Sequence, residues 1–365
     1  MRQVFPDSET VAQRLAAHGG ITSGFDYLRL FLAFSVFVFH TIVVTVGTSA
    51  HIWGGPYRAL VGWYLPMFFA LSGFLVSSSL HRLGTIRIFL IYRALRIFPA
   101  LILVVALSAM VLGPLVTSLP LTEYFRHRLF FSYFLNVFGY EQYYLPGVFE
   151  STPRSGIVNQ PIWTVRYELL SYLLLTCLYF SLAIRYRKIL LVLISLATLA
   201  MTSNLLHNCF PDCLYHVNGR TLVLSFLTGV LFYQYREMIP INPVLALSAL
   251  GLACFFLSIG PLVNLAVMPL TYLVVYFGLM SPPKDNFFMR GDYSYGLYLF
   301  GAPVQQLFVW LMPDRLYWWF NLVTALPLAF ACACLSWNFV ESPILKRKEQ
   351  IAAFITRSAI GSRAA

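Results

Sequence analysis

One apolar run near the start of the chain limits most strongly what this sequence can fold into. Residues 27–46 are almost entirely apolar, and about 20 such residues are enough to cross a bilayer as a helix. The run nevertheless carries Arg29 near one end and His40 well inside. Ionisable side chains in a membrane span cost about 2.5–3.5 kcal/mol each on insertion scales, so they usually face a protein interior or a wet cavity.

The spacing of Arg29 and His40 places both side chains on one helix face. At about 100° per residue their separation is roughly 20° past three full turns, and at about 1.5 Å per residue they lie roughly 16 Å apart along the axis. The two side chains are therefore too far apart for a salt bridge, and they predict two charged positions along one buried pathway. Structural roles stay open: Arg29 could extend to the headgroups, and His40 could be a core histidine bonded to a carbonyl.

Composition extends this pattern to the whole chain. Hydrophobic residues make up 59% and charged residues only 11%, whereas a soluble domain has about 25% charged residues. We predict an all-α integral membrane protein, a polytopic bundle of about ten transmembrane helices. The predicted spans are 27–46, 60–79, 98–116, 162–183, 189–206, 220–235, 243–259, 262–280, 293–311 and 318–339.

The basic residues predict the topology of these spans. With the N-terminus in the cytoplasm, most of the 25 Lys and Arg residues fall on the inner side. The positive-inside rule is then satisfied with both termini cytoplasmic, and the net charge of +11 reflects topology and not nucleic-acid binding. We expect no cleaved signal peptide, and we divide the chain into an N-terminal segment 1–24, a transmembrane domain 25–345 and a basic tail 346–365. The basic residues expected outside are Arg58, Arg126, Arg128, Arg154, Arg166, Arg220 and Arg315.

Two further regions carry weaker signals. Segment 117–161 is rich in aromatic residues and too polar for a clean span, so we expect it to lie along the membrane interface or to re-enter. Cys209 and Cys213 share a short loop on the predicted outer side, where they could form a disulfide. No metal-ligand spacing occurs.

A cluster of arginines precedes the third predicted span. Arg93 and Arg96 share a helical face, and Arg87 lies about two turns earlier. Pro99 suits the start of the following helix. The arginines could simply anchor a cytoplasmic loop, or they could bind a phosphorylated cytoplasmic molecule, since guanidinium groups match phosphate oxygens.

Glu168 is the carboxylate that lies most clearly inside a predicted span. Such a carboxylate needs a partner. The adjacent Arg166 points elsewhere on the helix, so His40 and Arg29 are the candidate partners. A histidine paired with a carboxylate has the arrangement of a general base, although a structural ion pair would look the same in sequence.

Two more segments contain small or hydroxyl side chains. Ser72 and Gly73 interrupt an aromatic helix, which ordinarily indicates close helix packing. Asp292 and Tyr295 open the ninth predicted span among clustered hydroxyl groups, which could bind a ligand or anchor the interface.

Taken in order, these segments resemble the membrane-bound acyltransferase family 3, whose members acylate bacterial surface glycans, Nod factors and some secondary metabolites. They cover the chain from about residue 24 to 345. The segments that carry the resemblance are Arg29 and His40 in an Arg-x10-His spacing preceded by Asp26, Phe69-Ala-Leu-Ser-Gly-Phe-Leu75, Arg93-Ala-Leu-Arg96-Ile-Phe-Pro99, Ile162-Trp-Thr-Val-Arg-Tyr-Glu168, Tyr293-Ser-Tyr-Gly-Leu-Tyr-Leu299 and Asn338-Phe-Val-Glu341-Ser-Pro343.

The resemblance implies a multi-pass protein of the bacterial inner membrane that takes an acyl group, usually acetyl, from cytoplasmic acyl-CoA. No cofactor is expected to be permanently bound. The acceptor would be a hydroxyl of a glycan or lipid-linked oligosaccharide, and homo-oligomerisation stays open. It also implies that Arg29 and His40 are essential.

Residue roles follow as hypotheses from both lines of reasoning. His40 would be the general base or carry the acyl group covalently, assisted by Glu168 and Arg29. The expected donor-site arginines are Arg29, Arg87, Arg93 and Arg96, and the expected acceptor contacts are Asp26, Ser72, Trp163, Arg166 and Tyr295. A transporter of glycan intermediates would also bury charged residues along a pathway, and a non-catalytic export subunit would tolerate loss of His40.

Overall fold

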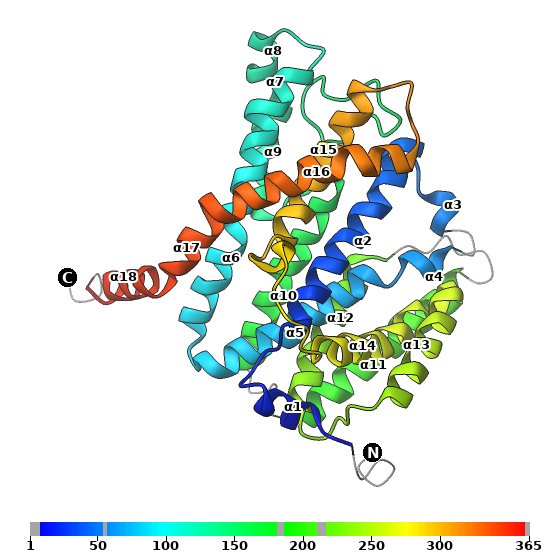
Figure 1. Ribbon diagram of the computed structural model, residues 1–365, viewed down its shortest axis with the longest axis vertical. Coiled ribbons are helices and arrows are strands. Elements are labelled where there is room, and N and C mark those ends of the chain that lie inside the picture. The colour runs from blue at the N-terminus through cyan, green and yellow to red at the C-terminus, as the bar shows by residue number, and fades with distance from the viewer. Residues whose placement is uncertain (1–7, 54–56, 181–185, 210–216, 362–365) are drawn as a thin grey trace. The chain divides into compact units, whose positions relative to one another are not determined.

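The computed structural model describes residues 8–53, 57–180, 186–209 and 217–361, and these residues form helices joined by irregular segments (Figure 1). No strand occurs among them, only three isolated bridges. The predicted all-α fold is therefore confirmed for the described part of the chain. The predicted disulfide between Cys209 and Cys213 lies outside it.

Six helical stretches of the described residues are long and apolar enough to cross a membrane. Five of them contain a whole predicted span, and Gly260–Gly278 covers all but the last two residues of the predicted span 262–280. The described residues of the other four predicted spans lie mostly in helices as well, but these helices are not among the six, so the prediction of ten spans is not confirmed. Segment 117–161 forms only short helices and an irregular stretch, with no span. The six stretches are Gly24–Val46, Arg58–Leu83, Ile86–Val116, Arg187–His207, Gly260–Gly278 and Trp318–Lys346.

The chain divides into two compact units, and the first comprises Met1–Val36, Thr48–Ser79 and Tyr167–Arg290. Its elements are α1 (Val11–Ala17), the first part of α2 (Gly24–Val46), α3 (Ala50–Trp53), α4 (Arg58–Val61), most of α5 (Tyr64–Leu83), most of α10 (Trp163–Phe180), α11 (Arg187–Cys209), α12 (Gly219–Gln234), α13 (Pro243–Ser258), η4 (Gly260–Ala266), α14 (Val267–Gly278) and η5 (Phe287–Met289).

Glycines bring α5 and α12 together in the first unit. A Cβ atom on Gly73 would collide with the carbonyl of Phe226, and one on Gly229 would collide with the carbonyl of Ala70. Small residues let membrane helices approach until their backbones touch. The close packing predicted around Ser72 and Gly73 is therefore confirmed.

The start of α2 is held by the segment that follows α14, also within the first unit. The backbone N–H of Gly24 donates to the Met280 carbonyl at 2.9 Å. The hydroxyls of Ser23 and Tyr27 donate to the carbonyls of Pro282 and Pro283, each at 2.6 Å. The first of these bonds satisfies a backbone N–H at the helix N-terminus, and the two side-chain bonds add to it, so together they fix the first turns of the helix that carries Arg29.

The second unit comprises Phe37–Gly47, Leu80–Arg166 and Gly291–Ala365. Its further elements are α6 (Ile86–Leu107), η1 (Ser108–Leu112), α7 (Gly113–Val116), α8 (Leu121–Arg126), α9 (Arg128–Tyr133), η2 (Phe134–Phe138), η3 (Gln160–Ile162), α15 (Ser294–Leu311), α16 (Trp318–Ser336), η6 (Trp337–Glu341), α17 (Ser342–Lys346) and α18 (Lys348–Gly361).

In this unit α6 begins earlier than expected. It starts at Ile86, so the predicted loop arginines lie on the helix, and Pro99 sits inside α6 instead of at its start. Proline is tolerated inside membrane helices because neighbouring groups can satisfy the backbone that it leaves unpaired. The π-helical turn η1 follows α6, and there the Ala109 carbonyl accepts a hydrogen bond from the Tyr124 hydroxyl at 2.7 Å.

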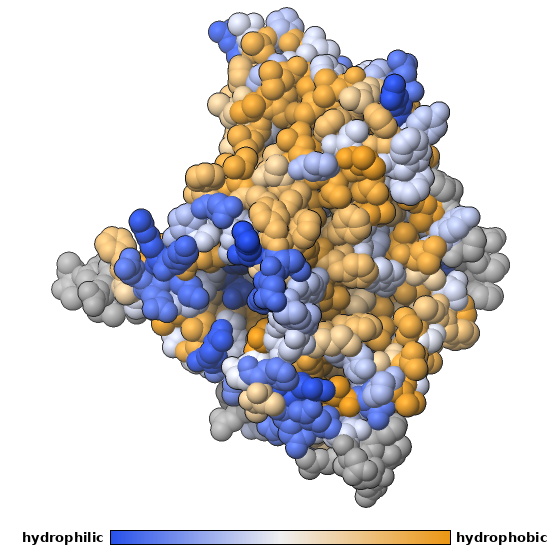
Figure 2. All heavy atoms as spheres, in the orientation of Figure 1, coloured by the Kyte–Doolittle hydropathy of each residue, from blue (hydrophilic) through white to orange (hydrophobic). Residues whose placement is uncertain are grey.

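Much of the exposed surface is apolar. Figure 2 shows hydrophobic residues over most of the face in view, with hydrophilic residues gathered in patches. On α16 and η6 the side chains of Val323, Leu335 and Phe339 are exposed. A helix that exposes such residues along its length is suited to contact lipid, which agrees with the six candidate spans.

Candidate functional site

The helix α2 carries both residues of the predicted pair. It runs without interruption over Gly24–Val46, so Arg29 and His40 lie on one helix, as predicted. Their separation along the axis is therefore roughly 16 Å by helix rise.

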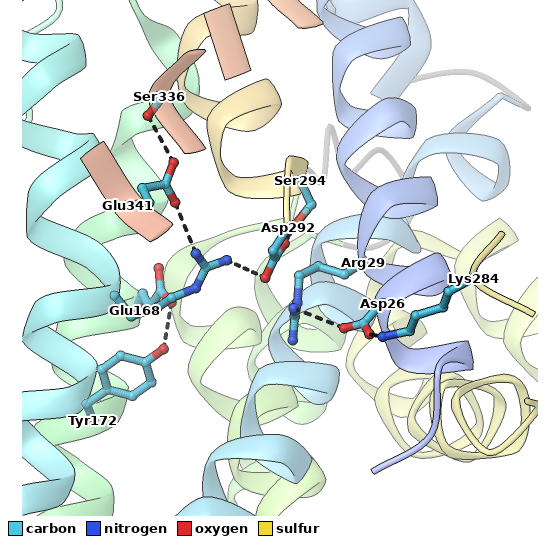
Figure 3. Close-up of polar contacts among 10 residues, drawn as sticks. Asp26, Arg29, Glu168, Tyr172, Lys284, Asp292, Ser294, Ser336 and Glu341 are labelled. Atoms are coloured by element: carbon cyan, nitrogen blue, oxygen red, sulfur yellow. Dashed lines mark hydrogen bonds and ion pairs between the residues drawn. The ribbon is translucent and has the colours of Figure 1, made fainter. Parts of the chain in front are cut away.

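Arg29 lies in a small charged network at the beginning of α2 (Figure 3). Its Nη1 is 3.6 Å from Oδ1 of Asp26, one turn earlier. The other carboxylate oxygen of Asp26 lies 2.5 Å from Nζ of Lys284. The carboxylate of Asp26 thus contacts both Arg29 and Lys284. The predicted contact of Asp26 with the acyl acceptor stays a prediction.

Arg96 forms an ion-pair cluster in the second unit with Asp292 and Glu341, whose side chains are labelled in Figure 3. Its Nη1 donates to Oε2 of Glu341 at 3.0 Å, and its Nη2 donates to Oδ2 of Asp292 at 2.5 Å. The guanidinium also lies over the rings of Tyr295 and Trp337, each 5.6 Å from the ring centroid. Arg96 therefore ties α6 to the start of α15 and to η6.

A π-helical turn delivers Glu341 to this cluster. In η6, residues five apart lie over one another, and the Ser336 hydroxyl donates to Oε1 of Glu341 at 2.9 Å. Glu341 is only 1% exposed and lies in the stretch Trp318–Lys346. The predicted last span ended at residue 339 and so left Glu341 out, whereas Glu168 lies on α10, which is not among the six candidate spans.

The remaining predicted donor-site arginines differ in their surroundings. Arg93 is partly buried, and its guanidinium lies 5.8 Å from the centroid of the Phe89 ring, one turn earlier on α6. Arg87 is exposed near the start of the same helix. Their binding of phosphate stays a prediction, and the same holds for Arg96, whose two terminal nitrogens already contact carboxylates.

Glu168 lies in a hydrogen-bonded chain of the first unit. Its Oε1 accepts a hydrogen bond from the Tyr172 hydroxyl, one turn later on α10, at 2.7 Å (Figure 3). The Ser72 hydroxyl on α5 lies 3.5 Å from that of Tyr172, at the limit of a hydrogen bond. Ser72 therefore belongs to the surroundings of Glu168, and the predicted pairing of Glu168 with His40 stays a prediction.

Three predicted acceptor contacts lie in the second unit. Arg166 is exposed and forms a long ion pair, 3.7 Å, with Glu141. Trp163 is the first residue of α10 and is partly buried. The Tyr295 hydroxyl donates to the Ile97 carbonyl at 3.3 Å, so this side chain supports the Arg96 cluster. The role of each as an acceptor contact stays a prediction.

His40 is 8% exposed, and its Nδ1 has no hydrogen-bond partner among the described residues. One turn earlier, the Phe37 carbonyl accepts a hydrogen bond from Nε2 of Gln305 on α15, at 2.8 Å. This bond holds α15 against the part of α2 that carries His40. Arg154 is tied to the end of the same helix, because its Nη1 donates to the Gly47 carbonyl at 3.0 Å.

Several residues of these networks escaped sequence reasoning. Glu341 lies in a segment that carries the family resemblance and Asp292 directly precedes another, but the sequence did not predict that either carboxylate is a partner of Arg96. Lys284 and Arg154 gave no signal of their contacts, because each looks like an ordinary basic residue of a loop. Their partners lie far away in the chain and become visible only after folding.

An apolar cavity of about 630 Å³ lies within the first unit. It is bordered by α2, α13 and α14, and its lining includes Leu28, Phe31 and Leu273. No Asp, Glu, Lys, Arg or His side chain is among its lining residues, so it offers mainly apolar space.

The long apolar helices and the buried charged networks define a multi-pass helical membrane protein. The family model described as "Acyltransferase domain" matches residues 22–340. The chain therefore belongs to the acyltransferase 3 family, as its sequence segments predicted, and it is an acyltransferase.

Two relatives are similar over nearly their whole length. Nodulation protein 10 of Rhizobium leguminosarum bv. viciae is 27% identical over 375 residues, covering 92% of this chain and 96% of the relative. The O-acetyl transferase of Shigella phage Sf6 is 27% identical over 340 residues, covering 88% of this chain and 96% of the relative. No solved structure matches the chain.

Proposed function

We propose that this protein is an O-acetyltransferase of the bacterial inner membrane, which moves an acetyl group from cytoplasmic acetyl-CoA to a hydroxyl of a cell-surface or exported glycan. The observation that carries the proposal is the family match over residues 22–340, together with the similarity to a phage protein named O-acetyl transferase. The acceptor is a sugar hydroxyl, either on a polymer or on a lipid-linked oligosaccharide.

In the proposed reaction, one proton must leave the acceptor hydroxyl. The acceptor hydroxyl oxygen attacks the thioester carbonyl carbon while His40 takes the hydroxyl proton. The carbon–sulfur bond then breaks, and the CoA thiolate leaves and is protonated. His40 suits this role because it is buried and its Nδ1 is unpartnered among the described residues. General-base catalysis contributes about 10²–10⁴-fold in rate.

The phosphates of the donor are the natural ligands for arginine side chains. Arg29, Arg87 and Arg93 are the candidates that we favour. Arg96 supports the reaction by holding α6, α15 and η6 together, since its guanidinium is already bound to Glu341 and Asp292. Glu168 keeps its predicted role as an assisting carboxylate.

The proposal is tested with membranes that contain the protein, acetyl-CoA labelled on the acetyl group, and the surface polysaccharide of the host as acceptor. We expect alkali-labile label in the glycan, with free CoA thiol released in equal amount. His40→Ala should remove the transfer at unchanged expression, and normal transfer by this variant would exclude His40 as the base. Binding of the glycan intermediate without thiol release would favour a transporter instead.

A further inference from the structure

Arg154 is held in a defined position in the second unit, beside the part of α2 that carries His40. Its Nη1 donates to the carbonyl of Gly47, at the end of α2, at 3.0 Å. Its own carbonyl accepts a hydrogen bond from Nε2 of Gln306 at 2.9 Å, and the same nitrogen donates to the Ile157 carbonyl at 2.7 Å. Hydrogen bonds thus hold the side chain of Arg154 against the end of α2 and its backbone carbonyl against α15.

Among the residues that the structure describes, no carboxylate forms an ion pair with Arg154. The ion pairs among the described residues involve other cations, such as Arg29, Arg96 and Arg166. The Nε of Arg154 is buried and has no hydrogen-bond partner there. A partly buried cation without a counter-ion carries a desolvation cost that an anion would offset.

His40 lies seven residues before Gly47, roughly 10 Å along the axis of α2 by helix rise, so the bond from Arg154 to the Gly47 carbonyl holds the guanidinium at the end of the helix that carries His40. The Nδ1 of His40 also lacks a partner among the described residues. Gln305 and Gln306 on α15 are 0% and 1% exposed, and they hold the two sides of this region, Phe37 of α2 and the loop of Arg154. These hydrogen bonds therefore hold the end of α2, the loop of Arg154 and α15 in one largely buried region, which contains both the His40 imidazole and the Arg154 guanidinium.

We propose that Arg154 is a further catalytic residue, which stabilises the negative charge that develops on the thioester carbonyl oxygen during acyl transfer. This inference rests on the proposed function. As the hydroxyl oxygen bonds to the carbonyl carbon, His40 takes the proton and the carbonyl π electrons move to the oxygen, next to the guanidinium. When the carbonyl re-forms, the carbon–sulfur bond breaks and the thiolate leaves. Preorganised donors for such an oxyanion are worth about 10²–10³-fold in kcat each.

The test compares Arg154→Gln and Arg154→Lys with Arg126→Gln, a control that removes the same charge from an exposed arginine of α8. We expect Arg154→Gln to lower kcat by about 10²–10³-fold and to leave the KM for acetyl-CoA and for the glycan within about threefold. Arg154→Lys should recover part of the rate because it restores the charge without the planar guanidinium. Arg126→Gln should match the wild type.

A second measurement separates catalysis from folding. Binding of a non-transferable thioether analogue of acetyl-CoA and the thermal unfolding midpoint in detergent should be the same for Arg154→Gln and wild type. The inference is wrong if Arg154→Gln keeps the wild-type kcat, if it raises only the KM for the glycan, or if it unfolds. If the wild-type protein transfers no acetyl group, the proposed function fails and this inference fails with it.

Discussion

Arg96 and Glu341 are 245 positions apart in the chain, yet Nη1 of Arg96 lies 3.0 Å from Oε2 of Glu341. The carboxylate is almost completely buried, and its other oxygen accepts from Ser336. Since Asp292 takes the second terminal nitrogen of the arginine, one guanidinium joins three helical segments.

Arg96→Ala is expected to destabilise the protein by about 3–5 kcal/mol, because removing one partner of a buried pair leaves the other charge uncompensated. The measurement is thermal or denaturant unfolding in detergent. Glu341→Gln should destabilise the protein less than Arg96→Ala, because the amide oxygen of the new side chain can still accept a hydrogen bond from Arg96. Arg82→Ala, at an exposed arginine near the end of α5, is the control, and an equal effect of Arg96→Ala and Arg82→Ala would contradict a structural role.

Arg93→Ala is expected to raise the KM for acetyl-CoA by roughly 10–100-fold, since hydrogen bonds to charged groups contribute about 1.5–3 kcal/mol. Steady-state kinetics on membranes with matched protein amounts measure it. Arg96→Lys, in protein that remains folded, should leave this KM within about threefold. An Arg93→Ala variant with the wild-type KM would remove Arg93 from the donor site.

Glu168→Gln is expected to lower kcat by about 100-fold if the carboxylate assists the base, within the usual range for acid–base groups. Tyr172→Phe removes the hydroxyl that donates to Glu168 at 2.7 Å and should lower kcat less. Because the two side chains act as a unit, the double variant should lose no more than Glu168→Gln alone. Additive losses would show that Tyr172 acts independently of Glu168.

Gly229→Ala is expected to destabilise the first unit by about 1–3 kcal/mol, the usual cost of overpacking, because its Cβ would meet the backbone of Ala70. Gly251→Ala on α13 is the matched control, with open space around the added methyl. There the better helix propensity of alanine, about 1 kcal/mol, should leave stability unchanged or higher. Equal unfolding midpoints for the two variants would argue against the close contact of α5 and α12.

The site could be predicted from the sequence in part. The segment around Arg93 and Arg96 was recognised as important, and the structure places it on α6 as a continuous helix. Its partners were not predicted. Glu341 lies beyond the limit drawn for the last span, and the π-helical turn that directs it inward leaves no periodic signal in sequence. Arg154 looked like an ordinary basic residue of an outer loop.

By itself the sequence determined the features that depend on neighbouring residues. The apolar runs predict helices of membrane-spanning length, and helix periodicity places Arg29 and His40 on one face of α2, because both follow from local backbone geometry. Tertiary structure alone decided which charges meet. The bonds from Arg96 to Glu341, from Lys284 to Asp26 and from Arg154 to Gly47 join distant parts of the chain. Such partners depend on how the helices pack. For Glu341, which is only 1% exposed, the desolvation cost of the buried charge favours the arrangement in which Arg96 binds it.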